Sequence, residues 1–370
     1  MIGYYAHSHG SGHCNFAQIF AKKLGTKLCI FTDSDYSFNT NSNVVRLANE
    51  NPDGTEFDRR KFEEPLSLHY APVNMRKITI RNQRILDHIN QKNINLLIID
   101  VSVEIAMLAR VSSVPYAYVR LQGDRSDIPH INAFEGATFL LAYFPEELEP
   151  ENTPDWIREK TVYLGFISKN MFESKSQPWP KEFRKNGKPN LLYVSGFGGS
   201  RRFEFEDLDK KFNIFIIGPG NNFDKNANIT SIGVVPCTHK YLAHADFIVA
   251  GCGANTTSEI LTLGKRFVAI SENRPYDEQK QLASGLEKMN WAVCIDSHST
   301  LDQALKNLHH INLKPLPKFK PEHFMNFCEV LSAEDFRSDE LLDRLEEQRQ
   351  NVINYLKLDA IINKPNQQLV

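Results

Sequence analysis

Short apolar runs alternate with helix-like segments along most of the chain, and this alternation restricts the possible folds more than any other feature of the sequence. Several runs are almost unbroken Ile, Leu and Val, which is typical of strands buried on both faces of a parallel sheet. Strands that alternate with helices build βαβ units and indicate the α/β class. In the first half the predicted strands are Ile2–Ala6, Leu28–Thr32, Val44–Ala48, Leu96–Asp100, Tyr116–Leu121 and Phe139–Phe144.

Apolar residues at helical spacing lie between these strands, and a second strand–helix cycle follows the first. The helices predicted for the first cycle are Asn15–Leu24, Asn74–Gln91 and Glu104–Val111. The strands predicted for the second cycle are Leu191–Ser195, Ile214–Gly218, Phe247–Gly251, Phe267–Ser271 and Ala292–Asp296. Its predicted helices are Lys240–Ala245, Thr257–Leu263, Glu278–Met289 and Leu301–Leu308.

Two cycles in 370 residues indicate two doubly wound, Rossmann-like domains in series, which agrees with about 150 residues per domain. Ligands of open α/β sheets bind beyond the carboxyl ends of the strands, so we expect the site in the cleft between the domains. The predicted divisions are a first domain over 1–168, a linker over 169–189, a second domain over 190–335 and a C-terminal segment over 336–370. This last segment contains a long polar helix, predicted at about Glu340–Leu358.

The composition excludes several classes of protein. With 41% hydrophobic and 24% charged residues, the chain resembles an ordinary globular protein and not a disordered one. The net charge of −2 gives no basic excess, so nucleic acid is not an expected partner. No apolar run reaches the ~20 residues that span a bilayer, and the sequence from Met1 to His7 lacks the regions of a secretory signal.

The six cysteines are scattered and form no C-x-x-C pair, which argues against a disulfide scaffold and against a structural zinc site. We therefore expect a reducing, cytoplasmic environment. Peripheral contact with the inner face of a membrane stays open, because it needs only a small apolar and basic patch.

A glycine-containing turn, Gly10-Ser11-Gly12-His13, follows the first predicted strand and precedes a helix. Such a turn lets the backbone approach a ligand. It lacks the third glycine of a dinucleotide-binding motif and the Gly-Lys-Ser/Thr of a P-loop, so neither of those sites is predicted. An imidazole at this place can act as a base near neutral pH. The alternative is that His13 caps the first helical turn or is solvated in the loop.

Asp100 ends the predicted strand Leu96–Asp100 and therefore faces the same cleft as the first turn. Its carboxylate can hold one nitrogen of His13, fix the imidazole tautomer and stabilise the imidazolium. The alternative is an N-cap for the following helix, a role that Asp fills readily.

Two further glycine-rich turns follow strands in the second half. The first runs from Ser195 to Ser200 through Gly198 and Gly199, and it either lets a ligand approach the backbone or is simply a tight loop. The second leads into a helix whose first amides can bind a pyrophosphate. Its candidate residues are Gly253, Ala254, Asn255, Thr256 and Glu259. The pair Thr256 and Glu259 also matches a capping box, which needs no ligand.

Together these motifs resemble those of the GT-B glycosyltransferases, in particular the branch with the peptidoglycan N-acetylglucosaminyltransferase and the UDP-glucuronosyl and plant natural-product transferases. The turn Gly10–His13 is similar to the acceptor-side loop of that branch. The second half resembles its nucleotide-sugar signature, and the resemblance covers roughly residues 1–300. The matching segments are Tyr241-Leu242-Ala243-His244, Gly251-Cys252-Gly253-Ala254-Asn255-Thr256, Glu259, Glu278-Gln279 and Ala283.

The chain also departs from that signature. Gly251 stands where the plant and animal members have a His that contacts pyrophosphate, and Ala254 stands in place of a Trp. No aromatic residue that would stack on uracil precedes Val235-Pro236. The pyrophosphate contacts are therefore expected from the amides at Gly253–Thr256 and from the turn at Ser195–Ser200, and the nucleotide base stays open.

The resemblance implies an inverting hexosyltransferase (EC 2.4) that moves a sugar from a nucleotide sugar, expected to be UDP-linked, to an acceptor hydroxyl held by the first domain. His13 would take the acceptor proton, and Asp100 would orient His13. Glu259 would bind the ribose hydroxyls, while Glu278 and Gln279 would bind the sugar hydroxyls. Helix amides would stabilise the leaving diphosphate, so neither a metal ion nor another cofactor is expected. The C-terminal helix would cross back onto the first domain.

Other functions share parts of this pattern. UDP-sugar hydrolases of nonulosonic-acid synthesis carry a similar Gly-x-Gly-His turn and use water as the nucleophile. A non-catalytic sugar-nucleotide-binding protein would need neither His13 nor Asp100, whereas the sequence has both. UDP-N-acetylglucosamine 2-epimerases also use GT-B domains, but their constellation of acids and histidines is not evident here. The sequence does not identify the acceptor.

Overall fold

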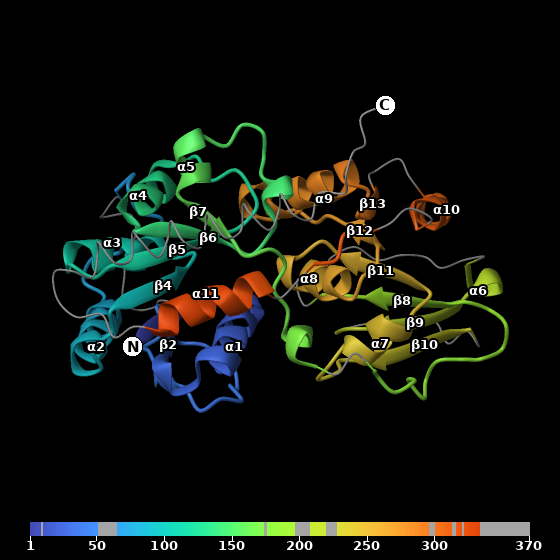
Figure 1. The fold of residues 1–370 in the computed structure, drawn as a ribbon, viewed down its shortest axis with the longest axis horizontal. Coiled ribbons are helices and arrows are strands. Elements are labelled where there is room, and N and C mark those ends of the chain that lie inside the picture. The colour runs from blue at the N-terminus through green and yellow to red at the C-terminus, as the bar shows by residue number, and fades with distance from the viewer. Residues whose placement is uncertain are drawn as a thin grey trace.

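The computed structural model describes residues 1–8, 10–50, 65–173, 176–196, 208–219, 228–295, 300–312, 316–319 and 322–333. Within these ranges the strands form two separate parallel sheets flanked by helices (Figure 1). The first sheet is built from residues 2–163 and the second from residues 190–295, so the chain completes one sheet before it begins the other. The predicted α/β class with two doubly wound, Rossmann-like domains is confirmed.

The first sheet has the strand order β3-β2-β1-β4-β5-β6-β7. Its strands are β1 Ile2–Ala6, β2 Leu28–Thr32, β3 Asn43–Arg46, β4 Leu96–Asp100, β5 Tyr116–Arg120, β6 Phe139–Ala142 and β7 Thr161–Tyr163. The strand order reverses between β1 and β4, where Ala6 lies opposite Asp100 at the carboxyl end of the sheet. A ligand crevice is expected at such a point of reversal.

The second sheet repeats this arrangement with the strand order β10-β9-β8-β11-β12-β13. Its strands are β8 Asn190–Val194, β9 Asn213–Ile217, β10 Ile229–Gly233, β11 Phe247–Gly251, β12 Phe267–Ile270 and β13 Ala292–Ile295. The order reverses between β8 and β11, so the turns after these two strands meet at one edge of the sheet.

Helices cover both faces of each sheet (Figure 1). The described α-helices are α1 Gly12–Leu24, α2 Arg76–Gln91, α3 Val103–Val111, α4 Ile128–Gly136, α5 Asp155–Glu159, α6 Leu208–Lys211, α7 His239–His244, α8 Ala254–Thr262, α9 Glu278–Lys288, α10 Leu301–Ile311 and α11 Glu322–Ala333. Neighbouring strand residues belong to opposite cores. Tyr4 and Ile98 pack on the α1 side, whereas Tyr5 and Ile99 pack on the side of α2 and α3. This burial on both faces explains why the strands are continuous apolar runs.

Most strand predictions agree with the structure. Ile2–Ala6, Leu28–Thr32, Leu96–Asp100 and Phe247–Gly251 are confirmed with the same bounds, and the other predicted strands differ by one or two residues at one or both ends. The patterns do not predict β7, β10, α4, α5, α6 or α11. Both missed strands lie at a sheet edge, where β7 has only three residues and polar residues interrupt the apolar ones of β10.

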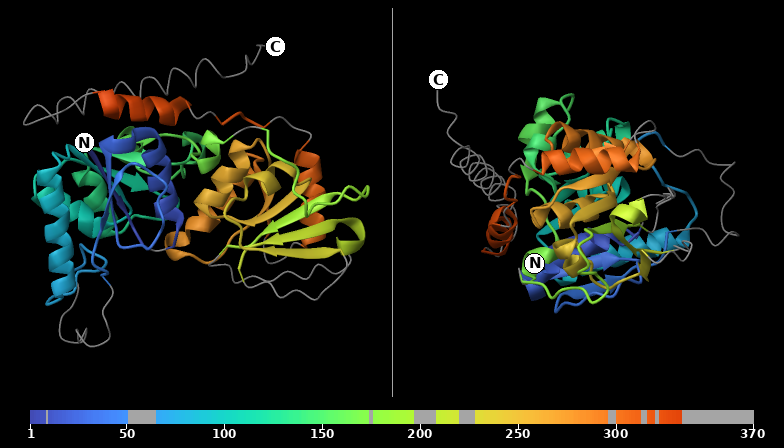
Figure 2. Two further views of the ribbon diagram at one scale, coloured as in Figure 1. Left: turned by 90° about the horizontal axis from the view of Figure 1, so that it is seen from below. Right: turned by 90° about the vertical axis from the view of Figure 1, so that its right-hand side faces the viewer.

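The chain returns to the first domain through α11. Phe324 and Phe327 join the core beside α1, and Lys23 Nζ lies 3.1 Å from Glu329 Oε1. Figure 2 shows α11 running alongside the first domain. In the described residues the helix that packs on the first domain is α11, which lies within the range 190–335 predicted for the second domain. The crossing predicted for the segment 336–370 is not tested. The helix predicted at Glu340–Leu358 lies outside the described residues.

The predicted linker over 169–189 packs against both domains where it is described. Lys169–Phe172 forms a short 3-10 helix that contacts α1 and α8, and Phe183 is buried in the core of the second domain. These contacts bring the start of α1 close to the start of α8.

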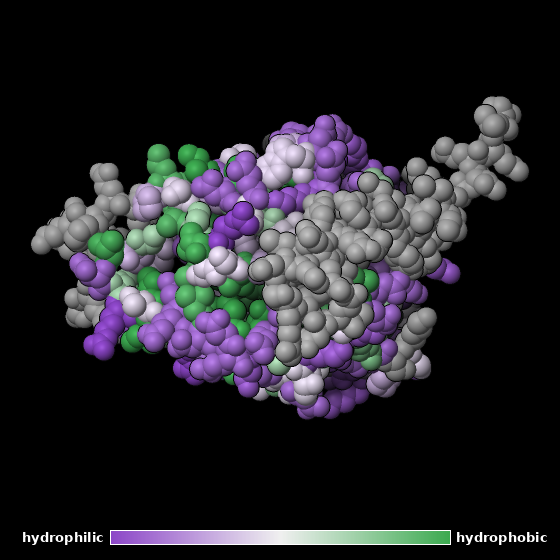
Figure 3. All heavy atoms as spheres, turned by 60° about the vertical axis from the view of Figure 1, so that its left-hand side comes forward, coloured by the Kyte–Doolittle hydropathy of each residue, from purple (hydrophilic) through white to green (hydrophobic). Residues whose placement is uncertain are grey.

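The surface of the first domain carries exposed apolar side chains. Figure 3 shows hydrophobic side chains gathered among hydrophilic ones on that end of the molecule. The exposed large apolar side chains of this domain include Leu66, Val73, Ile80, Val111 and Ile128. The helices that the structure describes include none with the length and apolar character needed to cross a membrane.

Candidate active site

His13 is the second residue of α1, which begins at the carboxyl end of β1. Gly10 has a φ of 73°, a left-handed conformation that glycine adopts without steric cost. The resulting turn brings His13 to the end of β4, where its Nδ1 lies 3.0 Å from Asp100 Oδ1. These two atoms are close enough to pair but are not aligned for an ideal hydrogen bond. Catalytic hydrogen bonds often tighten only when the substrate binds.

The Asp100 carboxylate is fully buried and is held from a second side. Its Oδ2 accepts a hydrogen bond of 3.0 Å from the Tyr4 hydroxyl, which lies 3.2 Å from the Tyr143 hydroxyl. A buried charge requires such partners, because leaving it unpaired in apolar surroundings is costly. The carboxylate therefore has one oxygen bound to the sheet and one oxygen facing His13.

Asp100 also controls the charge of His13. Burial disfavours the imidazolium, but the Asp100 carboxylate outweighs burial, so the pKa of His13 is raised above its usual value. The His13 side chain is still 15% exposed, so a ligand in the cleft can reach it.

The structure excludes the capping roles considered for both residues. The N-cap of α1 is Ser11, so His13 does not cap that helix. The N-cap of α3 is Ser102, whose hydroxyl accepts a hydrogen bond from the amide of Ile105. Asp100 therefore does not cap α3.

The start of α8 in the second domain lies against the start of α1. Asn255 Nδ2 donates to the carbonyl of Gly12 at 3.4 Å, and a Cβ on Gly12 would come within 3.1 Å of the same amide. The N-cap of α8 is Gly253, which has no capping side chain. The predicted capping box of Thr256 and Glu259 is therefore wrong, and no N-cap side chain occupies the first amides of α8.

Glu259 lies further along α8 and points back toward the linker. Its Oε2 accepts a hydrogen bond of 2.6 Å from the Thr238 hydroxyl, and its Oε1 lies 3.3 Å from Lys169 Nζ. The carboxylate is 12% exposed. A ribose that binds here would have to share or displace these two partners.

Glu278 and Gln279 begin α9 but have different surroundings. Glu278 Oε2 lies 3.4 Å from Nη2 of Arg125 in the first domain. Burial raises the pKa of Glu278, against the opposing effects of Arg125 and His13. Gln279 is buried, and its Oε1 accepts a hydrogen bond of 3.0 Å from the amide of Glu272. Of this predicted pair, Glu278 thus faces the first domain, whereas Gln279 holds the loop before α9.

The turn after β8 is described only at its start. The Ser195 amide donates to the carbonyl of Ile217 at 2.8 Å, and a Cβ on Gly218 would lie 2.2 Å from the Ser195 carbonyl. The backbone is therefore tightly packed at this point. The other predicted residues of this turn lie outside the described residues, namely Gly198, Gly199 and Ser200.

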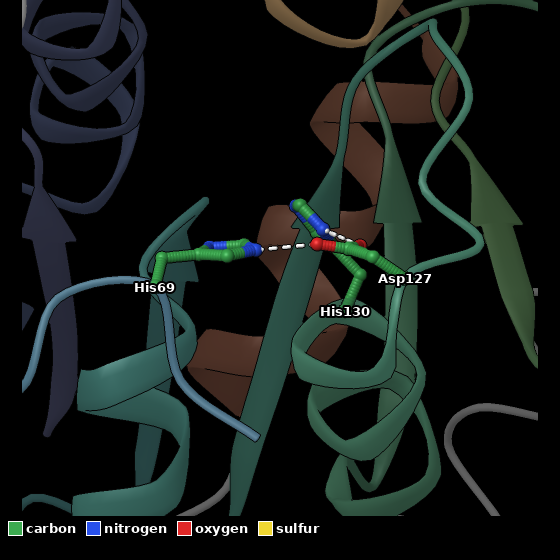
Figure 4. A group of neighbouring side chains, drawn as sticks. All are labelled: His69, Asp127 and His130. Carbon is green, nitrogen blue, oxygen red and sulfur yellow. Dashed lines mark hydrogen bonds and ion pairs between the residues drawn. The ribbon is translucent and has the colours of Figure 1, made fainter. Parts of the chain in front are cut away.

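A cluster of His69, Asp127 and His130 lies on the first domain (Figure 4). Asp127 Oδ2 lies 2.5 Å from His69 Nε2, and its Oδ1 contacts His130 Nδ1. The nitrogen and oxygen atoms of the cluster lie within 4.8 Å of one another, which is close enough to hold a metal ion. No motif in the sequence analysis includes these residues. The Asp-x-x-His spacing over 127–130 is a local signal for two of them, but His69 comes from a distant loop.

Arg125 decides which nitrogen of His130 carries the proton. Arg125 Nη1 lies 3.0 Å from His130 Nε2, and a guanidinium can only donate, so Nε2 must accept. Burial and the Arg125 charge lower the pKa of His130 to about 4, so the ring is neutral with its proton on Nδ1, facing Asp127. A histidine binds a metal ion through a nitrogen lone pair, and the His130 nitrogen that faces the cluster is the protonated Nδ1. The cluster therefore fits a hydrogen-bonded network better than a metal centre.

Tyr276 connects this network to the second domain. Its hydroxyl lies 3.2 Å from His69 Nε2, and its carbonyl accepts a hydrogen bond of 2.7 Å from the Asp124 amide. Tyr276 and Asp277 have φ values of 62° and 52°, directly before Glu278. Non-glycine residues keep such conformations only where their surroundings hold them. The first domain thus holds the loop that positions Glu278.

Two hollows flank the contact between Arg125 and Glu278. One is lined by both domains, including Ala254 at the start of α8 and Glu278. The other is bordered by Arg125. Arg120 and Leu121 line both hollows, so the hollows are adjacent.

Two facing Rossmann-like domains, with a helix that returns to the first, define the GT-B fold. UGT2 of Phytolacca americana, solved with UDP-2fluoro-glucose and pterostilbene, matches with a TM-score of 0.59 and 12% identity over 97% of this chain and 99% of its own. MurG of Acinetobacter baumannii matches with a TM-score of 0.52 and 14% identity over 96% and 99%. The spinosyn rhamnosyltransferase SpnG, solved with thymidine diphosphate, matches with a TM-score of 0.54 and 11% identity over 97% and 100%.

No protein-family model and no curated protein matches the sequence. The similarity to solved structures therefore identifies the fold, and the expected GT-B architecture is confirmed over nearly the whole chain.

Proposed function

We propose that this protein is an inverting glycosyltransferase of the hexosyltransferase class (EC 2.4), which transfers a sugar from a nucleotide sugar to an acceptor hydroxyl. The observation that carries the proposal is the pair His13 and Asp100, 3.0 Å apart at the start of α1 and next to the first turn of α8. A base in one domain and helix amides in the other supply the two things that sugar transfer needs, namely an activated nucleophile and a stabilised leaving group.

The geometry of the pair suggests how the proton moves. With Nδ1 beside Asp100, the neutral His13 ring carries its proton on Nδ1 and has its lone pair on Nε2. Nε2 takes the proton of the acceptor hydroxyl while the hydroxyl oxygen attacks the anomeric carbon. The bond from this carbon to the diphosphate oxygen breaks, its electron pair leaves with the diphosphate, and the configuration inverts. Asp100 stabilises the imidazolium that forms.

The donor would bind to the second domain. Its diphosphate would lie at the amides of Gly253–Thr256 and of the turn Ser195–Ser200, where the positive end of α8 favours negative charge without a metal ion. Glu259 would bind the ribose in place of Lys169 and Thr238. UDP is the expected nucleotide and TDP is the alternative, since UGT2 was solved with a UDP-sugar and SpnG with thymidine diphosphate.

The acceptor would bind to the first domain. Exposed apolar side chains there, such as Val73 and Ile80, suit an acceptor with an apolar part or a contact with a membrane surface.

The test is a panel of UDP- and TDP-sugars, incubated with and without glycan, lipid-linked and small aromatic acceptors, with the products measured by mass. We expect one acceptor to gain the mass of one sugar residue with the wild type but not with His13→Ala. Sugar release at an equal rate without acceptor would instead indicate a hydrolase. Nucleotide binding without any turnover would indicate a non-catalytic binding protein.

A further inference from the structure

Arg125 of the first domain and Glu278 of the second form an ion pair that is not fully closed. The distance between Arg125 Nη2 and Glu278 Oε2 is 3.4 Å, whereas a direct charge-assisted hydrogen bond is about 2.7–2.9 Å long. The side chains are only 9% and 24% exposed, so water does not fully compensate for the long contact. The pair therefore has hydrogen-bonding capacity that the protein does not use.

Other contacts hold the guanidinium of Arg125 in its position. Its Nη1 donates to His130 Nε2, and the other nitrogen of that ring is bound to Asp127. The Tyr276 ring centre lies 4.8 Å from the guanidinium carbon. Arg125 is thus held by a histidine of fixed tautomer and by an aromatic ring.

Arg125 Nε is an unused donor. It is buried and has no hydrogen-bond partner in the described part of the chain. Buried donors in native proteins almost always have a partner, and an exception requires an explanation. Nε and Nη2 lie on the same edge of a guanidinium, so the free donor is next to the atom that faces Glu278.

We propose that Arg125 contacts the donor sugar together with Glu278, and that the pair selects a sugar with a hydroxyl group between them. One hydroxyl can accept a hydrogen bond from Arg125 Nε and donate one to the Glu278 carboxylate. Ala254 and Glu278 line the same hollow. A sugar attached to a nucleotide at the start of α8 is therefore within reach of Glu278. This inference rests on the proposed function, which supplies the nucleotide sugar.

The local charges favour a neutral hydroxyl over an anionic group. The negative charges of Asp100 and Glu278 both raise the pKa of His13, and the positive charge of Arg125 lowers it. A carboxylate or phosphate next to Glu278 would place a second negative charge beside that carboxylate, and of the two nearby guanidinium groups the one of Arg274 is already paired with Glu272. A deoxy sugar would leave both partners unpaired, and sites built around a hydroxyl reject such analogues strongly.

The experiment measures binding without turnover. Calorimetry gives the dissociation constants of UDP, UDP-glucose, UDP-galactose and UDP-N-acetylglucosamine, and of TDP and TDP-glucose. The sugar gain is the affinity of a nucleotide sugar divided by that of its nucleotide. We expect a sugar gain for at least one donor, and a loss of about tenfold or more for one of its deoxy analogues. In Arg125→Gln the sugar gain should fall by a similar factor while the nucleotide affinity stays the same.

Matched variants separate a sugar contact from a general effect of charge. Arg274→Gln removes an equal charge near Glu278, but Arg274 pairs with Glu272 at 3.4 Å, so its sugar gain should equal that of the wild type. Glu278→Gln should reduce the sugar gain, and the double variant with Arg125→Gln should lose little more, because both changes remove the same hydroxyl contact. Arg125→Lys keeps the charge without the Nε donor and should behave like Arg125→Gln.

The outcomes distinguish the inference from the proposed function. An unchanged sugar gain in Arg125→Gln, or no sugar gain in the wild type, would overturn the inference while nucleotide binding still supported the function. If neither UDP nor TDP binds to the wild type, the proposed function is wrong and the inference fails with it.

Discussion

Asp100 Oδ1 lies 3.0 Å from His13 Nδ1, while Oδ2 of the same carboxylate accepts a hydrogen bond from Tyr4 on the neighbouring strand. The carboxylate is therefore fixed by the sheet and can fix the imidazole in turn. Because α1 starts at the carboxyl end of β1 and Asp100 ends β4, the pair is formed at the point where the strand order reverses.

Replacing His13 tests the proposed base. His13→Ala should lower turnover by ~100- to 10,000-fold, the usual contribution of a positioned base, and leave nucleotide affinity nearly unchanged. His7→Ala is the control, because the His7 ring lies 6.0 Å from the His13 ring but pairs with Glu50. Similar turnover in the wild type and in His13→Ala would mean that the base is elsewhere.

The dependence of activity on pH tests the role of Asp100. The base must be neutral, so kcat/KM should fall as the pH drops through the His13 pKa, which Asp100 raises. Asp100→Asn removes that effect and should move the acid limb of the profile to lower pH, with a lower maximal rate. Tyr4→Phe keeps the carboxylate charge, so its acid limb should stay close to that of the wild type. An acid limb that does not move in Asp100→Asn would contradict this role.

Nucleotide binding should depend on Glu259. Glu259→Gln weakens charge-assisted hydrogen bonds to ribose hydroxyls, each worth roughly 1.5–3 kcal/mol, and calorimetry should show UDP affinity lower by about 10- to 100-fold. Thr238→Val removes one protein partner of Glu259 but keeps its carboxylate, so UDP affinity should stay the same or rise. Unchanged affinity in a folded Glu259→Gln protein would limit Glu259 to its contacts with Thr238 and Lys169.

Turnover should persist in excess chelator, because helix amides are proposed to neutralise the diphosphate. His69, Asp127 and His130 are the residues to examine if it does not. Should activity disappear and return with magnesium or manganese, the proposed amide-based stabilisation is wrong. Loss of that metal response in His69→Ala would then locate the ion at this cluster.

The buried His130 should make folding stability depend on pH. Its pKa is about 6.5 in the unfolded chain and about 4 in the folded protein, so between these values only the unfolded state binds the proton. This contribution to stability is present above about pH 6.5 and is lost as the pH falls toward 4, at about 1.4 kcal/mol per pH unit. Denaturant unfolding of His130→Gln should show a smaller slope in this window. Equal slopes for variant and wild type would count against the lowered pKa.

The fold was predictable where a local pattern specifies an element. Strands such as Leu96–Asp100 are buried on both faces, so they appear as unbroken apolar runs with definite ends. The edge strand Ile229–Gly233 and the helix Glu322–Ala333 were missed, because their type depends on what they pack against. The capping box predicted for Thr256 and Glu259 is wrong, because both residues lie inside α8 and its N-cap is Gly253.

The site residues also fall into two groups, those that a local sequence pattern predicts and those that only tertiary packing brings together. His13 and Asp100 were predictable as candidates, because both follow apolar strands whose carboxyl ends meet in a parallel sheet. Arg125 and His69 were not, because they have no motif and approach Glu278 and Asp127 only after the domains and loops have packed.

The sequence by itself determined the α/β class, the two sheets and the turns that start α1 and α8, since apolar periodicity and glycine turns act over neighbouring residues. Only the tertiary structure decided that Arg125 faces Glu278, that His130 carries its proton on Nδ1, and that α11 packs on the first domain. These features depend on distances between side chains far apart in the chain, and such distances exist only once the hydrophobic cores have formed.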